Sequence, residues 1–267
     1  MAKISVCIIT FNEEKFVGQC IEAVKGFADE IIVVDSHSFD KTVQIAKKLG
    51  AKVFRKKFSD FAAQRNFALT KAKNEWIFFP DPDEICPKEL AQEIVETVNS
   101  KNSADGYWIP YKNHYGKKEL KYGGESYYHM RLFRRKNAKY DQIVHEEAKI
   151  AGTEGKMKNK IIHFSYPDLS DLLQKLNHYS SLEAKARKMK GEKFSLLKLI
   201  FHPVGSFFYR LIWWKGILDG LEGLILATTF AFYRFQVNVK LWELEKEEVK
   251  ARTITSQTTI SIFCYFN

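Results

Sequence analysis

The sequence predicts an α/β protein in which helices cover both faces of a mostly parallel β-sheet. Short, almost uninterrupted apolar runs alternate with amphipathic stretches over the first part of the chain, and strands buried on both faces have this continuous apolar character. Polar loops follow the apolar runs, as expected at the carboxyl ends of parallel strands, where open sheets bind ligands. A chain of 267 residues with 45% hydrophobic and 28% charged content is globular, with room for one large domain and an appendage.

The predicted elements of the first part follow one another as strand and helix. Expected strands cover residues 4–10, 30–35, 52–55 and 76–80, and expected helices cover 14–25, 41–49 and 61–72. From Gly106 the apolar runs become shorter, at 107–111, 130–134 and 160–166, with a glycine-bearing loop at 122–125, which predicts a mixed or antiparallel extension. After Pro167, leucines at helical spacing predict a helix over 170–190 that packs one face on apolar surface.

The segment 194–242 differs in kind, because it is rich in aromatic and aliphatic residues yet interrupted by charges. Its uncharged stretches, 199–209 and 223–233, are well short of the roughly 20 apolar residues that span a bilayer. Aromatic side chains beside Arg210 and Lys215 favour a membrane-interface surface, where rings lie among headgroups and cations meet anionic lipid. The alternative is a helical pair packed on the main domain, or a dimer contact. The tail 251–267 is polar and β-prone and matches no motif.

The charge balance limits the partners. A formal charge of +10 and a pI near 9.2 call for a polyanionic neighbour, which is nucleic acid, an anionic membrane or a phosphorylated substrate. Four scattered cysteines without CxxC spacing suggest neither a zinc site nor a disulfide framework, and they fit a reducing cytoplasm. Because the N-terminus enters a strand-like run without the order of a signal peptide, we expect a cytoplasmic protein.

The most specific local feature is Asp81-Pro82-Asp83-Glu84 at the end of an apolar strand. Two carboxylates one residue apart can hold a hard divalent cation and leave coordination positions for diphosphate oxygens and water. Pro82 restrains the turn and keeps Asp81 out of helical geometry. An isolated pattern of this kind is most often a cap and a solvated turn, but its place at a strand end of a parallel sheet favours a ligand site.

A second carboxylate, Asp35, ends the strand 30–35 and is followed by Ser36-His37-Ser38. At this position a carboxylate can accept hydrogen bonds from a ribose or a base N–H, while Ser38 or Asp40 caps the next helix. From this segment alone, two caps explain the acids equally well. The segment has no GxGxxG or Walker loop, which argues against dinucleotide oxidoreductases and P-loop NTPases.

Four runs, at residues 6–14, 29–38, 61–68 and 81–84, resemble in order and spacing the family-2 glycosyltransferases of the GT-A fold. The runs 131–135, 144–146 and 175–184 are most similar to the bacterial lipopolysaccharide-core branch that adds a β-linked glucose to heptose. The resemblance covers residues 3–240. It implies a Rossmann-like, mostly parallel sheet with helices on both faces, a mixed-sheet acceptor half and a C-terminal helical appendage.

The resemblance also implies site residues. The residues implied for the nucleotide-sugar donor are Thr10, Asn12, Glu13, Asp35, Ser38, Gln64, Arg65 and Asp81. Asp83 is the implied ligand of a divalent metal, Mg²⁺ or Mn²⁺, with Asp81 at the ribose or the metal shell. His163 is a further candidate ligand of the metal or diphosphate, since GT-A enzymes often supply one late in the chain. Pro82 stands where this branch usually has Ala, so the turn departs from the common pattern.

Direct displacement with inversion needs a base that takes the proton of the acceptor hydroxyl as it attacks the anomeric carbon. The resemblance implies Glu146 as this base, with His145 as the alternative. Arg65 and a later cation, namely Arg131, Arg134 or Lys175, are expected to stabilise the charge that develops on the leaving diphosphate.

We therefore expect a GT-A transferase domain at 1–167, a helical membrane-interface region at 168–250 and a tail of no assigned role at 251–267. The expected reaction moves a hexose, with glucose favoured, from a nucleoside diphosphate sugar, with UDP favoured, to a lipopolysaccharide-core or other lipid-linked saccharide. The expected location is peripheral, on the inner face of the cytoplasmic membrane, with no nucleic-acid partner. The alternatives are a polyprenyl-phosphate glycosyltransferase, a nucleotidyltransferase, and a non-catalytic basic protein that binds membrane or nucleic acid.

Overall fold

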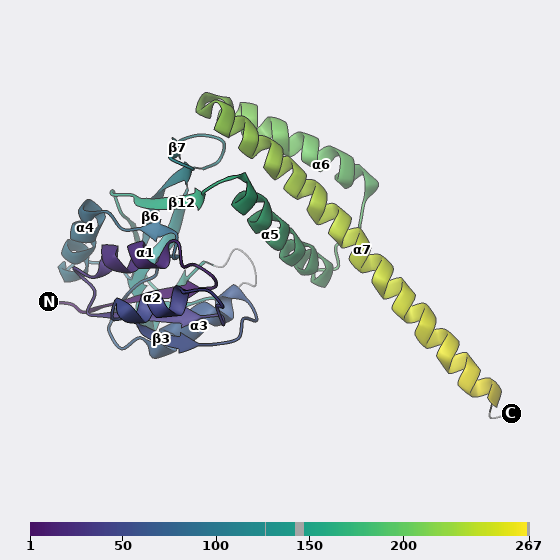
Figure 1. Cartoon of the computed structure of the whole chain (residues 1–267), viewed down its shortest axis with the longest axis horizontal. Helices are drawn as coiled ribbons and strands as arrows, with labels where there is room; N and C mark the ends of the chain where they lie inside the picture. The colour runs from purple at the N-terminus through teal and green to yellow at the C-terminus, as the bar shows by residue number, and fades with distance from the viewer. Residues whose placement is uncertain (126, 142–146, 266–267) are drawn as a thin grey trace. The chain divides into compact units, whose positions relative to one another are not determined.

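The computed structural model describes residues 1–125, 127–141 and 147–265, with side chains described up to residue 247. The chain divides into two compact units, Met1–Asp168 and Leu169–Asn267 (Figure 1). The first unit contains every strand in the described part of the chain, and the second is helical.

The first part of unit one alternates strands and helices as predicted. Its strands are β1 (Ile4–Thr10), β2 (Glu30–Asp35), β3 (Lys52–Arg55) and β4 (Trp76–Phe78), and its helices are α1 (Val17–Val24), α2 (Thr42–Lys48), α3 (Phe61–Lys71) and α4 (Lys88–Asn99). These strands pair in parallel in the order β3-β2-β1-β4. The predicted α/β class is thus confirmed.

Helices cover both faces of this parallel sheet. The side chains along each strand point alternately to one face and to the other, so each strand packs against helices on both sides. Along β1, Ile4, Val6 and Ile8 pack in one buried cluster with residues of α1, α2 and α4. Cys7 and Ile9 point to the other face and pack with residues of α3. The continuous apolar runs of the sequence therefore reflect strands buried on both sides.

The later strands extend the sheet in mixed orientation. They are β5 (Glu84–Ile85), β6 (Gly106–Tyr115), β7 (Lys118–Leu120), β8 (Tyr128–Arg134), β11 (Glu154–Lys156) and β12 (Ile161–Tyr166), while β9 (Ala138–Lys139) and β10 (Lys149–Ile150) form a separate pair and residues 135–137 form a 3-10 turn. β8 joins the parallel half by antiparallel pairing with β4, and the order continues β8-β6-β12-β5. The predicted mixed extension is confirmed.

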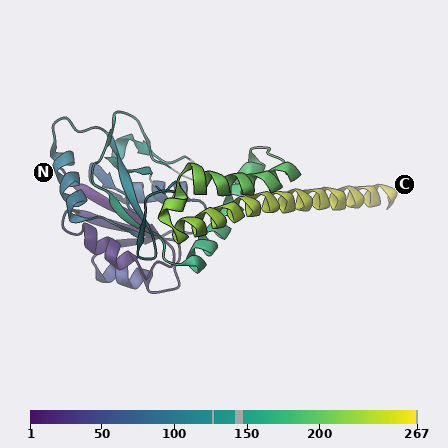
Figure 2. The ribbon, with the colours of Figure 1, turned by 90° about the horizontal axis from the view of Figure 1, so that it is seen from above.

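The second unit consists of α5 (Leu169–Met189), α6 (Leu196–Phe208) and the 45-residue α7 (Leu221–Tyr265), with a π-helical turn at Tyr209–Trp213 and a 3-10 turn at Gly216–Asp219. Figures 1 and 2 show α6 and α7 side by side. In α5, the buried positions Leu172, Leu176, Ser180 and Ala184 fall at four-residue spacing and form one face. Among the described residues, no helix combines the length and apolar character needed to cross a bilayer.

Two local expectations differ from the structure. The helix expected from residue 14 begins at Val17, because Glu13 to Phe16 form a turn in which Phe16 N and Val17 N both donate to Glu13 O. The β-prone tail is helical up to Tyr265, as a continuation of α7. Each residue added to an existing helix gains one hydrogen bond without the cost of starting a new helix. This gain can outweigh a weak β-propensity of the added residues.

The corner between α6 and α7 gives a stability prediction. A Cβ at Gly223 would lie 1.8 Å from the carbonyl oxygen of Gly216, whereas a Cβ at Gly205 in α6 would meet nothing within 4 Å. Gly223→Ala should therefore lower the free energy of unfolding by about 2 kcal/mol or more, because backbone must move. Gly205→Ala, the matched control, should be neutral or stabilising by up to about 1 kcal/mol. Urea unfolding followed by circular dichroism measures both, and equal values would contradict the close contact.

Candidate active site

The turn that follows β4 is held between two strands of the extension. On one side Phe79 N donates to Arg131 O of β8 at 2.8 Å. On the other side Phe164 N of β12 donates to Asp83 O at 3.0 Å, and Glu84 pairs with His163 across β5 and β12. The carboxylates predicted at this turn are therefore fixed by pairing to parts of the chain far away in sequence.

Asp81 is held by two arginines. Its Oδ1 accepts from Arg65 Nη2 at 2.7 Å, and its Oδ2 accepts from Arg131 Nη2. Burial opposes ionisation of this carboxyl, but the positive charges of Arg131 and Arg65 hold its pKa well below the usual range. With both oxygens engaged, Asp81 serves in this structure as the anchor of two guanidinium groups.

Arg131 connects Asp81 to a second buried carboxylate, Glu84. Arg131 Nη2 donates to Glu84 Oε1 at 2.7 Å, and its Nε donates to the Tyr111 hydroxyl at 2.6 Å. The same hydroxyl donates to Glu84 Oε1 at 2.6 Å, and burial raises the pKa of Tyr111 well above its usual value, so it stays protonated. Glu84 Oε2 also accepts from Asp81 N at 3.0 Å. These contacts form one closed network of paired charges.

Asp83 is directed away from this network and toward His163. Asp83 Oδ2 lies 3.6 Å from His163 Nε2, and Asp83 is buried. The other ring nitrogen, His163 Nδ1, lies 2.7 Å from Asn113 Oδ1, which can only accept. Nδ1 also lies 2.8 Å from Ser165 Oγ. A neutral ring with its proton on Nδ1, donated to Asn113, would present the Nε2 lone pair to a cation held by Asp83.

The Asp83 and His163 pair fits a divalent cation. Two ligands at about 2.1 Å from an octahedral ion and at right angles to each other are about 3 Å apart, and the observed separation is slightly wider. Within the described residues, no group of three or more His, Cys, Asp or Glu side chains could hold a metal ion. A cation at this pair would therefore need further oxygen ligands from a substrate or from water.

The loops after β1 and β2 are bonded to each other. Asn12 and His37 both have left-handed backbone, with φ of 56° and 65°. Asn12 N donates to Ser38 Oγ at 2.9 Å, Phe39 N donates to Asn12 Oδ1 at 3.1 Å, and Glu13 N donates to Thr42 Oγ1 at 2.7 Å. The polar side chains predicted at these strand ends therefore shape a common edge.

Asp35 lies fully buried beneath this edge. Its Oδ2 accepts from Ser38 N at 3.0 Å, and Thr10 Oγ1 lies 3.5 Å from its Oδ1. The structure thus brings Thr10, Asn12, Asp35 and Ser38 together, while Asp40 bonds to Thr42 at the start of α2. Asp35 and its neighbours fit the interpretation as a ligand site, and Asp40 fits the interpretation as a cap of the next helix.

Helix α3 delivers its polar residues to three different places. Gln64 Nε2 donates to Ser36 Oγ at 2.6 Å and to Lys56 O at 2.9 Å, which ties it to the loops after β2 and β3. Arg65 reaches Asp81, and Asn66 exchanges two hydrogen bonds with the backbone of Tyr140. Asp60 begins the helix by accepting from Ala63 N, a side-chain N-cap.

Several residues of the site have no place in the sequence-based prediction. Tyr111 and Asn113 lie two residues apart on β6, so they share one sheet face, and alternation along that strand was the available signal. His129 pairs with Glu147, whose other oxygen accepts from Met130 N at 3.2 Å. His129 shares the face of Arg131 on β8 and packs edge-on against Tyr111. Glu146 and His145, the predicted bases, lie outside the described residues.

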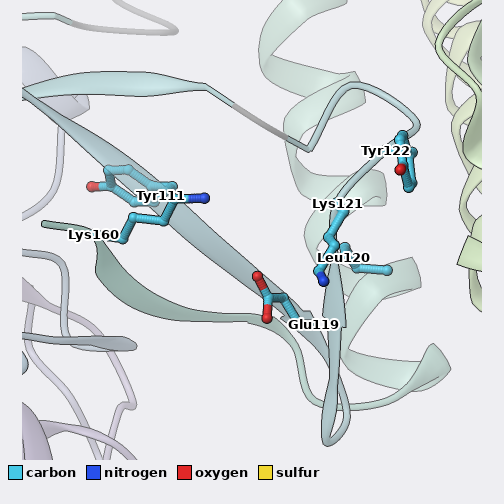
Figure 3. A pocket seen from close by; sticks show the side chains of 6 residues that line it. All are labelled: Tyr111, Glu119, Leu120, Lys121, Tyr122 and Lys160. Atoms are coloured by element: carbon cyan, nitrogen blue, oxygen red, sulfur yellow. The ribbon is translucent and has the colours of Figure 1, made fainter. Parts of the chain in front are cut away.

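A pocket of about 400 Å³ opens beside β6 and β7, in the mixed half of the sheet (Figure 3). It is lined by Tyr111, Glu119, Leu120, Lys121, Tyr122 and Lys160. Glu119 pairs with Lys112 at 3.1 Å, so the lysines at 121 and 160 give the pocket a net positive lining. The pocket lies next to the glycine-bearing loop at 122–125.

Comparison with known proteins agrees with this geometry. The sequence model of glycosyl transferase family 2 matches residues 5–157. An uncharacterized glycosyltransferase of Rickettsia typhi is 32% identical over 99% of this chain and 94% of its own length. The lipopolysaccharide core biosynthesis glycosyltransferase LpsC of Rhizobium meliloti is 31% identical over 93% of this chain and 94% of its own length. The crystal structure of residues 1–349 of S. aureus TarS aligns with 92% of both chains at 17% identity and a TM-score of 0.47.

The buried charge network predicts a large difference between two arginines of the same strand. Arg131→Met should lower the free energy of unfolding by about 3–5 kcal/mol, because it leaves buried Glu84 without its cation and removes one of the two cations that hold Asp81. Arg134, the matched control, pairs with Glu75, whose side chain is 57% exposed, so Arg134→Met should cost about 1 kcal/mol or less. Urea unfolding at neutral pH measures both. Similar losses for the two variants would show that the network contributes no special stability.

Proposed function

The chain belongs to glycosyl transferase family 2 and is a glycosyltransferase of the GT-A fold, and on that premise we propose that it moves a hexose, with glucose favoured, from a nucleoside diphosphate sugar to a lipid-linked saccharide with inversion. The relative from Rhizobium meliloti, described as a lipopolysaccharide core biosynthesis glycosyltransferase, supports a lipopolysaccharide-core acceptor. A non-catalytic basic protein does not fit a member of this family.

The observation that carries the proposal is the Asp83 and His163 pair, in which a carboxylate oxygen and an imidazole nitrogen lie 3.6 Å apart. These residues would hold Mg²⁺ or Mn²⁺, and the bound metal would neutralise charge on the leaving diphosphate. We assign Asp81 to the same site in a supporting role, since its oxygens are already bonded to Arg65 and Arg131. Coordination of the metal by Asp81 would require it to leave one of these arginines.

The donor nucleotide would lie over the edge formed by the loops after β1 and β2. Asp35 is fully buried beneath that edge, where it accepts from Ser38 N. It would reach ribose hydroxyls or a base N–H only when the side chains above it move apart to admit the nucleotide. Thr10, Asn12, Glu13, Ser38 and Gln64 would shape the nucleoside pocket. Arg65, held at the turn by Asp81, would stabilise negative charge on the diphosphate as the bond to the sugar breaks. UDP is the favoured nucleotide.

The acceptor would approach from the mixed half of the sheet. The pocket beside β6 and β7 carries Lys121 and Lys160, and their charge suits a saccharide that bears phosphate or carboxylate groups. Glu146 is the proposed base that removes the proton of the acceptor hydroxyl, and the hydroxyl oxygen then attacks the anomeric carbon. Peripheral attachment to the inner face of the cytoplasmic membrane would bring this half to a lipid-linked acceptor.

The metal assignment predicts the response of nucleotide binding to one substitution. UDP at a hundredfold excess over its Kd should add about 2.7 kcal/mol to the free energy of unfolding of the wild type, and the gain should require Mn²⁺. Asp83→Ala should abolish the Mn²⁺-dependent part, while Glu22→Ala, which removes an exposed carboxylate of α1, should retain it. Thermal unfolding with UDP or GDP, with and without Mn²⁺, tests this. A metal-dependent shift that survives in Asp83→Ala would place the metal elsewhere.

The base assignment predicts a separation of binding from chemistry. Glu146→Gln should keep the nucleotide-dependent thermal shift but lower transfer at least about a hundredfold, the usual contribution of a general base. Transfer of labelled glucose from UDP-glucose to a lipid-linked saccharide extract is the measurement. Glu147→Gln is the neighbouring comparison. If Glu147→Gln stopped transfer and Glu146→Gln did not, the base would be Glu147 or its partner His129.

A further inference from the structure

The second unit exposes an apolar face that no other described part of that unit covers. Helix α6 has no buried residue along its 13 positions. Its exposed apolar residues are Leu196, Leu197, Ile200, Phe201, Val204 and Phe208, each at least 51% exposed. At 100° per residue these positions fall within one arc of about 140°. They therefore form a single continuous face, which we call the α6 face.

The face continues past the end of α6 around the corner of the hairpin. Ile212 and Trp213 in the π-helical turn are 62% and 74% exposed, and Ile217 and Leu218 in the following 3-10 turn are each 62% exposed. Monomeric soluble proteins rarely expose contiguous apolar surfaces above a few hundred Å². Ten exposed large apolar side chains along one helix and the adjoining corner indicate a contact with another apolar phase or molecule.

The charges that α6 and the corner themselves carry are of one sign, although Lys198 pairs with Glu192 at 2.6 Å and Glu245 of α7 accepts from Phe194 N. Between Glu192 and Asp219 the chain has no acidic residue, while Lys193, Lys198, Arg210 and Lys215 are all basic. A second copy of the chain in a two-fold dimer would present the same patch, so like charges would meet across the interface and oppose it. A lipid surface with anionic headgroups has the opposite charge and an apolar interior.

The aromatic residues at the corner fit the same partner. Tyr209 and Trp213 stack at 6.4 Å between ring centroids, and Arg210 lies over the rings of Trp214 and Phe230. Tyr and Trp rings are enriched at the depth of the headgroups, where one end of the ring is apolar and the other is hydrated. The corner thus combines aromatic and cationic groups beside a face that is purely apolar.

We propose that the α6 face and the corner at residues 209–218 insert into one leaflet of a bilayer, so that α6 lies along the membrane surface and apolar burial, not charge alone, holds the protein there. This inference rests on the proposed function, because a lipid-linked acceptor is met at a membrane surface. It differs from simple electrostatic attachment in one respect: binding to uncharged lipid should persist.

Co-flotation with vesicles of phosphatidylcholine, and of phosphatidylcholine mixed with phosphatidylglycerol, tests the proposal on the full chain. The wild type should bind both, and more tightly the mixed vesicles. The variant Leu197→Gln/Phe201→Gln/Trp213→Gln should bind both at least about tenfold more weakly, because three exposed apolar side chains are lost. The matched control Leu169→Gln/Met189→Gln removes side chains that are 45% and 76% exposed at the two ends of α5 and should bind as the wild type does.

A charge variant separates the two contributions. Lys193→Gln/Lys215→Gln, which changes two exposed lysines beside the face, should lose only the preference for the mixed vesicles. In the wild type, phosphatidylcholine brominated on its acyl chains should quench part of the tryptophan fluorescence, and Trp213→Phe/Trp214→Phe, which changes both tryptophans of the corner, should remove that part. Failure of the wild type to bind phosphatidylcholine, or equal binding by the triple variant, would overturn the proposal. Sedimentation velocity without lipid tests whether a second copy of the chain binds the α6 face instead. If the wild type is a dimer and the triple variant is a monomer, the α6 face is a self-association surface and the membrane proposal fails.

The outcome for the membrane is separable from the outcome for transfer. The thermal shift with UDP and Mn²⁺ should be the same in the wild type, the triple variant and the control. If that shift is present in all of them and none binds vesicles, the membrane proposal fails and the transferase proposal stands. If the shift is absent in all of them and vesicles bind as expected, the proposed donor site fails and the membrane proposal stands.

Discussion

The buried pairing of Arg131 with Asp81 and Glu84 is the interaction on which the geometry of the site depends. Removing these charges from water costs several kcal/mol per ion, and the cost is offset only when each group finds good partners. Here the Tyr111 hydroxyl and the backbone N–H of Asp81 complete the set. Because both oxygens of Asp81 are fixed on one side of Pro82, the chain leaves the proline toward β12. The carboxylate of Asp83 therefore meets His163.

This turn lies where the sheet changes character. β4 pairs in parallel with β1 and antiparallel with β8, so the turn after β4 is the boundary between a parallel half and a mixed half. The parallel half supplies strand ends and helix α3, which suit a nucleotide. The mixed half supplies Arg131, Tyr111 and His163, and it contains the lysine-lined pocket. A group-transfer site needs a donor surface and an acceptor surface within reach of each other, and this boundary lies between the two.

The sequence predicted the parallel half well, because its signals are local. Apolar runs give β1 and β2, and the polar residues that follow them, such as Asp35 and Ser38, lie at the same edge by the rule for parallel sheets. The partners of Asp81 could not be read in this way. The contact of Arg131 with Asp81 joins residues 50 positions apart, and the two-residue strand β5 exists only because β12 pairs with it. The role of Asn113 likewise depends on the pairing of β6 with β12, which brings its side-chain oxygen within 2.7 Å of His163 Nδ1.

The corner between α6 and α7 has a further consequence for lipid contact. Gly223 allows α7 to approach the carbonyl of Gly216, which leaves this corner little freedom to open. A surface that is already folded in its bound shape loses little conformational entropy when it binds. Under the proposed membrane contact, such a preformed surface would also favour a leaflet with packing defects. The glycine contact would thus influence where on a membrane the enzyme accumulates, although it touches neither lipid nor substrate.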